Sequence, residues 1–342
     1  IFKQNYMALI DFDKIKDVLG LSKPLTKLIE VIAQGTGAIT QPYLIKKNAD
    51  AKAYEINVVS KAIAENQNGL ENIEYDEKKV SLRSLNKDSI QEVTSLPDRA
   101  ENRISYQEQK RQQNIERVTQ IAAEQLETEK DVSEEKVDDD WTTRFFNYAQ
   151  DVSNEEMQSL WGRILAGEVK NPKSYSLRAL ELIRNLSKRE AEIFTKVANY
   201  AVQTNNDYFL YKGKDGKLLE KFGVSFSDIA LIEELGLMHS GGFTSYKYSK
   251  VNQTSSGHLV FGSFIVFMER KPNTPEFSIS IQLFTTIGKE LLKLVDIDPN
   301  FEYVKAFAKE VKSENTSLKY AEVIEINAGT IRHSIPPKEI PE

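Results

Sequence analysis

The 342-residue chain carries 45 Lys and Arg against 51 Asp and Glu, a net charge of −6, and 40% of its residues are hydrophobic. Such a composition is that of an ordinary folded protein with room for two or three domains. The absence of cysteine excludes disulfide frameworks, thiolate metal sites and cysteine nucleophiles. The three histidines are far apart in sequence, so neither a metal site nor a cofactor is expected. The first residues do not resemble a secretory signal, and a cytoplasmic location is expected.

The first apolar segment, Leu21 to Ile45, raises the question of a membrane contact. Its longest uncharged run has 15 residues, Val31 to Ile45, which is short of the roughly 20 needed to span a bilayer. The segment contains an apolar stripe at helical spacing, formed by Leu25, Leu28, Ile29 and Ile32. Two interpretations are open: a helix packed on the rest of the protein, or an interfacial segment that places the protein peripherally at the inner membrane.

A second helical region follows a predicted helix at Tyr43–Asn66 and a polar, loop-like stretch at 67–97. The helix expected at Arg99–Lys136 is highly charged, and residues 99–140 contain 7 basic and 12 acidic side chains. Its apolar stripe is narrow and includes Ile115, Val118, Ala122 and Leu126. Either the charges are simply solvated, or the stripe mediates self-association. The adjacent Asp138, Asp139 and Asp140 are interpreted as the N-terminal cap of the next helix.

From Trp141 the pattern predicts four short helices in a compact bundle. Ser153 with Glu156, and Ser187 with Glu190, have the spacing of capping boxes. Gly167 is the predicted end of one helix, and Ser174 or Ser176 the predicted start of the next. 

Two features of this bundle could be mistaken for a functional site. Glu168 and Arg178 could form a catalytic pair, but a salt bridge that fixes the turn around Pro172 is the favoured interpretation, because no pocket or acid–base partner is apparent. Trp161 is expected to be a core anchor.

The same region carries a resemblance to a known family. The run Leu160–Glu168, with the pattern W-x-x-I-L-A-G-E, and the S-L-R run that follows Asn171-Pro172 resemble the bacterial domain of unknown function twenty-eight-oh-six. The motif comprises Trp161, Gly167, Glu168, Pro172, Ser176, Leu177 and Arg178. The N-terminal run Gly20–Ile29 is similar to the start of that family, which tends to have Gly at the position of Lys173. More distantly, the bundle is similar to the abortive-infection alpha group of phage-defence proteins. This resemblance implies a bacterial origin and a role in phage defence, and it implies no catalytic residue.

The C-terminal part combines helices with predicted strands at Tyr208–Tyr211, Phe243–Lys250, His258–Met268 and Glu276–Phe284. A capped helix ending at Gly236, followed by these strands and a helix capped by Thr285 or Thr286, resembles a winged-helix domain. Winged helices often bind DNA, but residues 207–293 contain 10 basic and 9 acidic side chains. This balance argues against nucleic acid as the partner.

The sequence therefore predicts a mainly α protein with a smaller α+β part: an N-terminal helical arm, a central helical bundle and a C-terminal winged-helix-like domain. The expected segments are residues 1–98, 99–140, 141–186 and 187–330, with a loose tail at 331–342. No catalytic motif is present. The function expected is that of a non-enzymatic, homo-oligomeric interaction or scaffold protein in phage defence, with a protein partner. The alternatives are a winged-helix DNA-binding regulator and a membrane-active effector.

Overall fold

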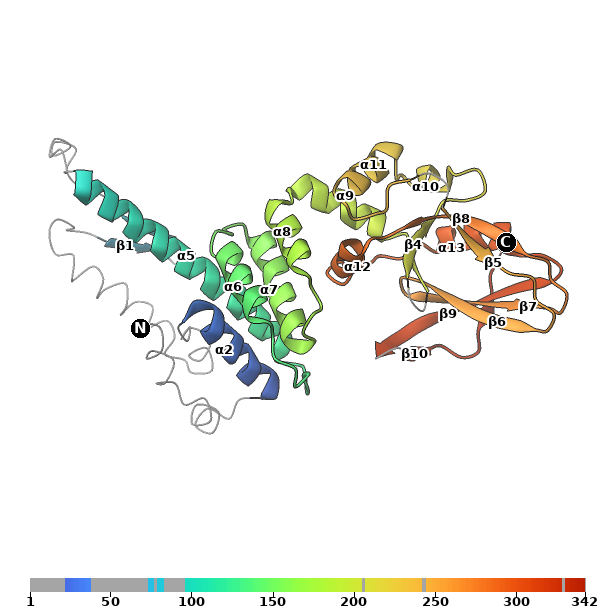
Figure 1. Cartoon of the computed structure of the whole chain (residues 1–342), viewed down its shortest axis with the longest axis horizontal. Helices are drawn as coiled ribbons and strands as arrows, with labels where there is room; N and C mark the ends of the chain where they lie inside the picture. The colour runs from blue at the N-terminus through green and yellow to red at the C-terminus, as the bar shows by residue number, and fades with distance from the viewer. Residues whose placement is uncertain are drawn as a thin grey trace. The chain divides into compact units, whose positions relative to one another are not determined.

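The computed structural model describes residues 22–37, 73–76, 79–82, 96–204, 207–241, 244–327 and 330–341. The chain divides into two compact units, Ile1–Lys173 and Ser174–Glu342. Figure 1 draws the chain from blue at its beginning to red at its end. The boundary between the units falls inside the segment 141–186 that was predicted as one bundle. The predicted helix at Tyr43–Asn66 lies outside the described residues.

The first unit is built from helices and one hairpin. Its described elements are α2 (Lys23–Thr36), β1 (Ile73–Asp76), β2 (Lys79–Leu82), α5 (Leu96–Leu126), α6 (Asp139–Ala149) and α7 (Glu155–Lys170). The strands β1 and β2 pair with each other in antiparallel register. Helix α5 packs along α7, and α2 packs against α6 and α7. The core between these helices is aromatic, with Trp161 tilted against the ring of Phe145 at 5.3 Å between centroids.

Two apolar stripes singled out from the sequence are covered by protein. Leu25, Leu28, Ile29 and Ile32 of α2 are all buried, which is the outcome expected of a helix that packs on the rest of the chain. On α5, Val118, Ala122 and Leu126 are buried and Ile115 is half-buried, because this part of the helix lies on α7. The surface proposed for self-association is therefore already occupied within one chain. The first half of α5 differs, since its Ile104 and Tyr106 are 53% and 68% exposed.

The close approach of α5 and α7 depends on Gly162. A Cβ atom at this position would lie 2.5 Å from Cγ2 of Ile121 and 3.1 Å from the carbonyl oxygen of Val118. Both atoms belong to α5, so any side chain would push the helices apart. The helices meet because Gly162 presents only backbone at the point of contact.

Most predicted helix starts are confirmed by side-chain caps. Asp138 accepts from the backbone N–H of Trp141, Ser176 from Ala179 and Thr285 from Gly288, and Ser187 forms a complete capping box with Glu190. Two predictions nearby are wrong. The cap of α7 is Asn154, which accepts from the backbone N–H of Met157. The hydroxyl of Ser153 instead accepts a hydrogen bond from the side-chain amide of Asn114. Helix α7 also continues through Gly167 and ends at Lys170, before Asn171 and Pro172.

The second unit is a large antiparallel sheet with helices. Its helices are α8 (Leu177–Asn185), α9 (Lys188–Ala198), α10 (Leu218–Lys221), α11 (Phe226–Glu234), α12 (Thr286–Leu292) and α13 (Phe301–Val311). Its strands are β3 (Ala201–Gln203), β4 (Tyr208–Tyr211), β5 (Thr244–Tyr248), β6 (Ser255–Phe261), β7 (Phe264–Arg270), β8 (Phe277–Leu283), β9 (Thr316–Asn327), β10 (Thr330–His333) and β11 (Lys338–Glu339). The strand order is β10-β9-β7-β6-β3-β4-β8-β5, with β11 paired to β9.

This architecture corrects the predicted fold class. The C-terminal part is not a winged helix and the protein is not mainly α, because nine strands join in one antiparallel sheet. The segment read as one strand, His258–Met268, is a hairpin of β6 and β7. The helix–turn–strand pattern around Gly236 is common to a winged helix and to this larger sheet. The sequence does not show that β3, β4 and β9 pair with the strands that were assigned to the wing. Residues 331–342, expected to be a loose tail, include strands that pair with β9.

One side chain completes the hydrogen bonding of the sheet. Strand β3 pairs with Tyr208–Leu210 of β4 and stops before Tyr211. Beyond it, the hydroxyl of Tyr303 on α13 accepts from the backbone N–H of Tyr211 and donates to its carbonyl, both at 2.7 Å. Tyr303 is 2% exposed, so these two backbone groups would otherwise be buried without partners. Helix α13 thus docks on the sheet through a hydroxyl that takes the place of a neighbouring strand.

An ion pair between a half-exposed lysine and a buried aspartate joins α9 to α11 and gives a pH-dependent prediction. Asp228 caps α11 with Ser225 and lies 2.6 Å from the ammonium of Lys196. Burial raises the pKa of Asp228, but hydrogen bonds from Lys196 and Ser225 outweigh it and leave the pKa below its usual value. The stabilisation is therefore present above the unfolded-state pKa of about 4 and is lost as the pH falls below it.

We expect Asp228→Asn to destabilise the second unit by about 1 kcal/mol at pH 7 and by less near pH 3. Urea unfolding of both proteins between pH 3 and 7 measures this difference. Glu234→Gln, at an exposed position on the same helix, is the control and should give no pH-dependent difference. A constant difference between wild type and Asp228→Asn across this range would contradict the assignment.

Candidate functional site

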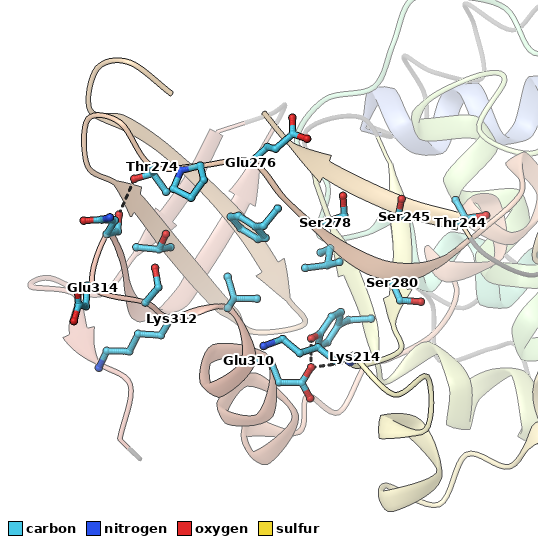
Figure 2. Close-up of a pocket in the computed structure, with 18 residues that line it drawn as sticks. Lys214, Thr244, Ser245, Thr274, Glu276, Ser278, Ser280, Glu310, Lys312 and Glu314 are labelled. Carbon is cyan, nitrogen blue, oxygen red and sulfur yellow. Dashed lines mark hydrogen bonds between the residues drawn. The ribbon is translucent and has the colours of Figure 1, made fainter. Parts of the chain in front are cut away.

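The second unit contains a groove of about 800 Å³. Four stretches of chain line it: Tyr211 and Lys214 at the end of β4, Thr244–Ser245 of β5, Thr274–Ser280 around the start of β8, and Glu310–Thr316 between α13 and β9. Figure 2 shows these stretches, with β5 and β8 on one side and the end of α13 on the other. We call this site the groove.

Seven of the eighteen residues that line the groove are Ser or Thr. They are Thr244, Ser245, Thr274, Ser278, Ser280, Ser313 and Thr316. A hydroxyl both donates and accepts, so such a wall can bond to carbonyl and N–H groups alike. Some of these hydroxyls serve the fold: Thr274 donates to the carbonyl of Lys271 at 2.6 Å, which fixes the turn before β8.

Glu310 holds one end of the groove together. Its carboxylate accepts from the hydroxyl of Tyr211 at 2.6 Å and from the backbone N–H of Lys214 at 2.8 Å. Burial raises the pKa of Tyr211, and the neighbouring carboxylate of Glu310 raises it further. The phenol therefore stays protonated and acts as a hydrogen-bond donor. These bonds tie α13 to the turn after β4, as the dashed lines in Figure 2 show.

A buried arginine ties the opposite end. The guanidinium of Arg270 donates to the carbonyls of Ser249 and Pro275 at 2.8 and 2.9 Å. It also lies over the rings of Phe277 and Tyr248, at 5.3 and 6.0 Å from their centroids. Because Arg270 comes from β7, it joins the end of β5 to the stretch that enters β8.

Charges of both signs surround the groove. Its acidic side chains are Glu276, Glu310 and Glu314, and its basic ones are Lys214 and Lys312. Glu276 is paired with Lys247 of β5 at 2.9 Å. The excess of carboxylates does not favour a phosphate backbone, which normally needs several unopposed Lys or Arg contacts.

The residues of the family motif lie outside the groove and have mainly structural surroundings. Trp161 is fully buried among α6 and α7. Glu168, 1% exposed, accepts from the backbone N–H of Lys173 at 2.6 Å. Lys173 has φ +69°, a backbone conformation that favours glycine. The proposed Glu168–Arg178 bridge would cross the boundary between the two units and stays a prediction.

Ser176 has the clearest role among the motif residues. Its backbone N–H and its hydroxyl both donate hydrogen bonds to the carboxylate of Glu290 on α12, at 2.8 and 2.9 Å. Glu290 is 8% exposed, so a buried negative charge lies at the N-terminus of α8, where the helix dipole favours it. Leu177 begins that helix, and the exposed Arg178 borders a second, apolar hollow of about 420 Å³ with Leu186 and Ile287. Gly167 lies in the last turn of α7, and Pro172 follows the end of that helix.

The groove was not found by sequence reasoning. Its four stretches are separated by about 30 residues each, and none carries a recognisable motif. Within the described ranges, no group of three or more His, Asp or Glu residues could hold a metal ion. Of the helices described, none combines the length and apolarity that crossing a membrane would require.

Comparison with known families gives one match. The family described as "Protein of unknown function (DUF2806)" matches residues 98–308, from the charged helix α5 into α13. No curated protein matches the chain, and no solved structure does. The match covers more than half of the chain and includes the motif around Trp161 and Ser176. The chain therefore belongs to the DUF2806 family.

Proposed function

We propose that this protein is a non-enzymatic interaction protein whose groove binds an extended segment of a protein partner. The observation that carries the proposal is the groove lining, in which five of the seven Ser and Thr residues are at least partly exposed: Thr244, Ser245, Ser278, Ser280 and Ser313. An extended polypeptide presents carbonyl and N–H groups in alternation. Hydroxyls, which donate and accept, suit both groups without selecting one charge.

The charged groups of the groove support a binding role. Glu310 is engaged by Tyr211 and Lys214, and Glu276 by Lys247, so both carboxylates stabilise the walls. An acid–base catalyst needs a group poised to exchange its proton with a substrate, whereas the raised pKa of Tyr211 keeps that proton in place. The remaining exposed charges, Lys214, Lys312 and Glu314, can contact side chains of both signs on a partner.

A role in phage defence rests on the sequence likeness to the abortive-infection group alone and stays a prediction. The membrane-active alternative has less support than the sequence suggested, since Leu25, Leu28, Ile29 and Ile32 are buried in the first unit.

Selection from a displayed library of random peptides tests the proposal. We expect the full chain to enrich peptides that bind it with micromolar dissociation constants, and Ser313→Trp, which fills the groove from the turn, to weaken that binding at least tenfold (~1.4 kcal/mol or more). Ser256→Trp, at an exposed position on β6 outside the groove, is the matched control and should bind as wild type does. Failure to enrich any peptide, or equal binding by Ser313→Trp, would overturn the proposal.

A further inference from the structure

Strand β5 forms one edge of the sheet. It pairs with β8 along its whole length, from Thr244 opposite Ile281 to Tyr248 opposite Phe277. It stands last in the strand order, so its other side has no strand neighbour within the described part of the chain. Unpaired strand edges are templates for another strand, and proteins usually protect them with charged side chains, proline, bulges or covering loops. The one charged side chain of residues 244–248, Lys247, is already paired with Glu276 at 2.9 Å. Residues 244–248 contain no proline and their register with β8 is regular.

The neighbouring strands determine which backbone groups of β5 point outward. Ser280 of β8 bonds to Lys212, and Phe284, directly after β8, bonds to Tyr208, so the even-numbered residues of β8 face β4. Ile279 and Ile281 therefore face β5 and bond to Tyr246 and Thr244. By the same alternation, the N–H and C=O groups of Ser245 and Lys247 point away from β8. No hydrogen bond to them exists among the residues that the structure describes.

These two outward residues are arranged symmetrically about Tyr246. We propose that the protein forms a homodimer in which β5 pairs with β5 of a second copy, antiparallel, with the two-fold axis at Tyr246. Ser245 of each copy then bonds to Lys247 of the other, and all outward groups of the strand are satisfied. The inference concerns the edge of the sheet and does not depend on the groove binding a peptide.

Side chains and charges favour this register over its neighbours. Centring the axis on Lys247 would place two ammonium groups opposite each other, and it would need Ser249, whose carbonyl is already bonded to Arg270. Centring it on Tyr246 places each Lys opposite a Ser. It also brings together two tyrosines that are each 39% exposed, a favourable cross-strand pair.

The size of the contact sets the expected affinity. Five-residue strands bury less area than a standard stable interface, so we expect a reversible dimer with a dissociation constant of roughly 10–100 µM. Association must therefore be measured over a wide concentration range.

Because the chain has no cysteine, a single introduced thiol reports the register directly. In this pairing, position 246 faces itself in a non-hydrogen-bonded pair, with Cα atoms about 4.5 Å apart, which suits a disulfide. We expect Tyr246→Cys to form a covalent dimer under mild oxidation on a non-reducing gel. Tyr248→Cys, on the same strand and face, would face Thr244 of the second copy, about 13 Å from the other thiol, and should stay monomeric. Equal crosslinking of both variants, or of neither, would overturn the proposed pairing.

Proline substitution provides a second, independent test. Lys247→Pro removes an N–H that points away from β8, so the fold should be kept while the dimer loses two hydrogen bonds. In sedimentation velocity from about 1 to 500 µM, a range that spans the expected dissociation constant, we expect Lys247→Pro to weaken dimerisation at least tenfold. Lys247→Ala, which keeps the N–H, should weaken it less than threefold, and thermal melts verify that both variants are folded. The proposal would be contradicted by a wild-type protein that stays monomeric over the whole range, or by a folded Lys247→Pro that dimerises as strongly as wild type. If Lys247→Pro does not fold, Ser245→Pro takes its place in the same experiment.

Discussion

Trp161→Ala is expected to destabilise the first unit by about 3–5 kcal/mol, the range for removing a large buried aromatic side chain. The side chain of Trp161 is fully buried and contacts the rings of Phe145 and Tyr148, at 5.3 and 6.3 Å between centroids. The cavity left by the indole would lie where α6 meets α7, and the helices cannot close it without losing their contacts with α2 and α5.

Hydrogen exchange measured by mass spectrometry localises this effect. Protection should fall across α5, α6 and α7 and remain unchanged in the sheet, since the two units are separately compact. Trp161→Phe should cost less, because the indole N–H has no hydrogen-bond partner to lose. Tyr106→Ala, at a position 68% exposed on α5, is the control and should change stability by less than about 0.5 kcal/mol. Equal loss of protection in both units would contradict their independence.

Tyr303→Phe is expected to destabilise the second unit by about 2–4 kcal/mol, although it removes only one oxygen atom. The lost hydroxyl bonds to both the N–H and the C=O of Tyr211, and the buried phenylalanine ring offers neither group a partner. Burial also raises the pKa of Tyr303 well above its usual value. Wild-type stability should therefore decline above pH 10, where the unfolded tyrosine ionises, and the variant should lack this contribution.

Chemical denaturation at pH 7 and pH 10.5 measures both effects. Tyr320→Phe is the matched control, since no hydrogen bond of its hydroxyl occurs among the described residues, and it should change stability by less than about 0.5 kcal/mol. If Tyr303→Phe were as stable as wild type, the hydroxyl would not substitute for a strand neighbour.

Local features were predictable from the sequence to the extent that one side chain determines them. Asp138, Ser187 and Thr285 cap helices as expected, because a cap needs only its own backbone within three residues. Ser153 failed as a cap because a distant residue, Asn114 of α5, competes for its hydroxyl. Gly167 failed as a helix end because a glycine can also lie inside a helix, at a cost that packing offsets.

The sheet and the groove could not be predicted from the sequence, for a related reason. Alternating residues identified several strands, but pairings such as Arg270 with Thr316 join residues that are distant in sequence. A strand pattern does not name its partner, so a winged helix and a nine-stranded sheet predict similar local signals. The groove depends on those pairings, since it exists only where the start of β8 faces the turn after α13.

The extent of the family match has a practical consequence for making fragments of this protein. The match ends at residue 308, inside α13. Strand β9 begins only at Thr316, and all seven residues of β7 pair with it. A fragment cut at 308 would expose the hydrophobic side of β7 and an unpaired edge in the middle of the sheet, which is an aggregation hazard. Ile340, near the end of the chain, is only 8% exposed. A soluble second unit therefore requires the residues through Ile340.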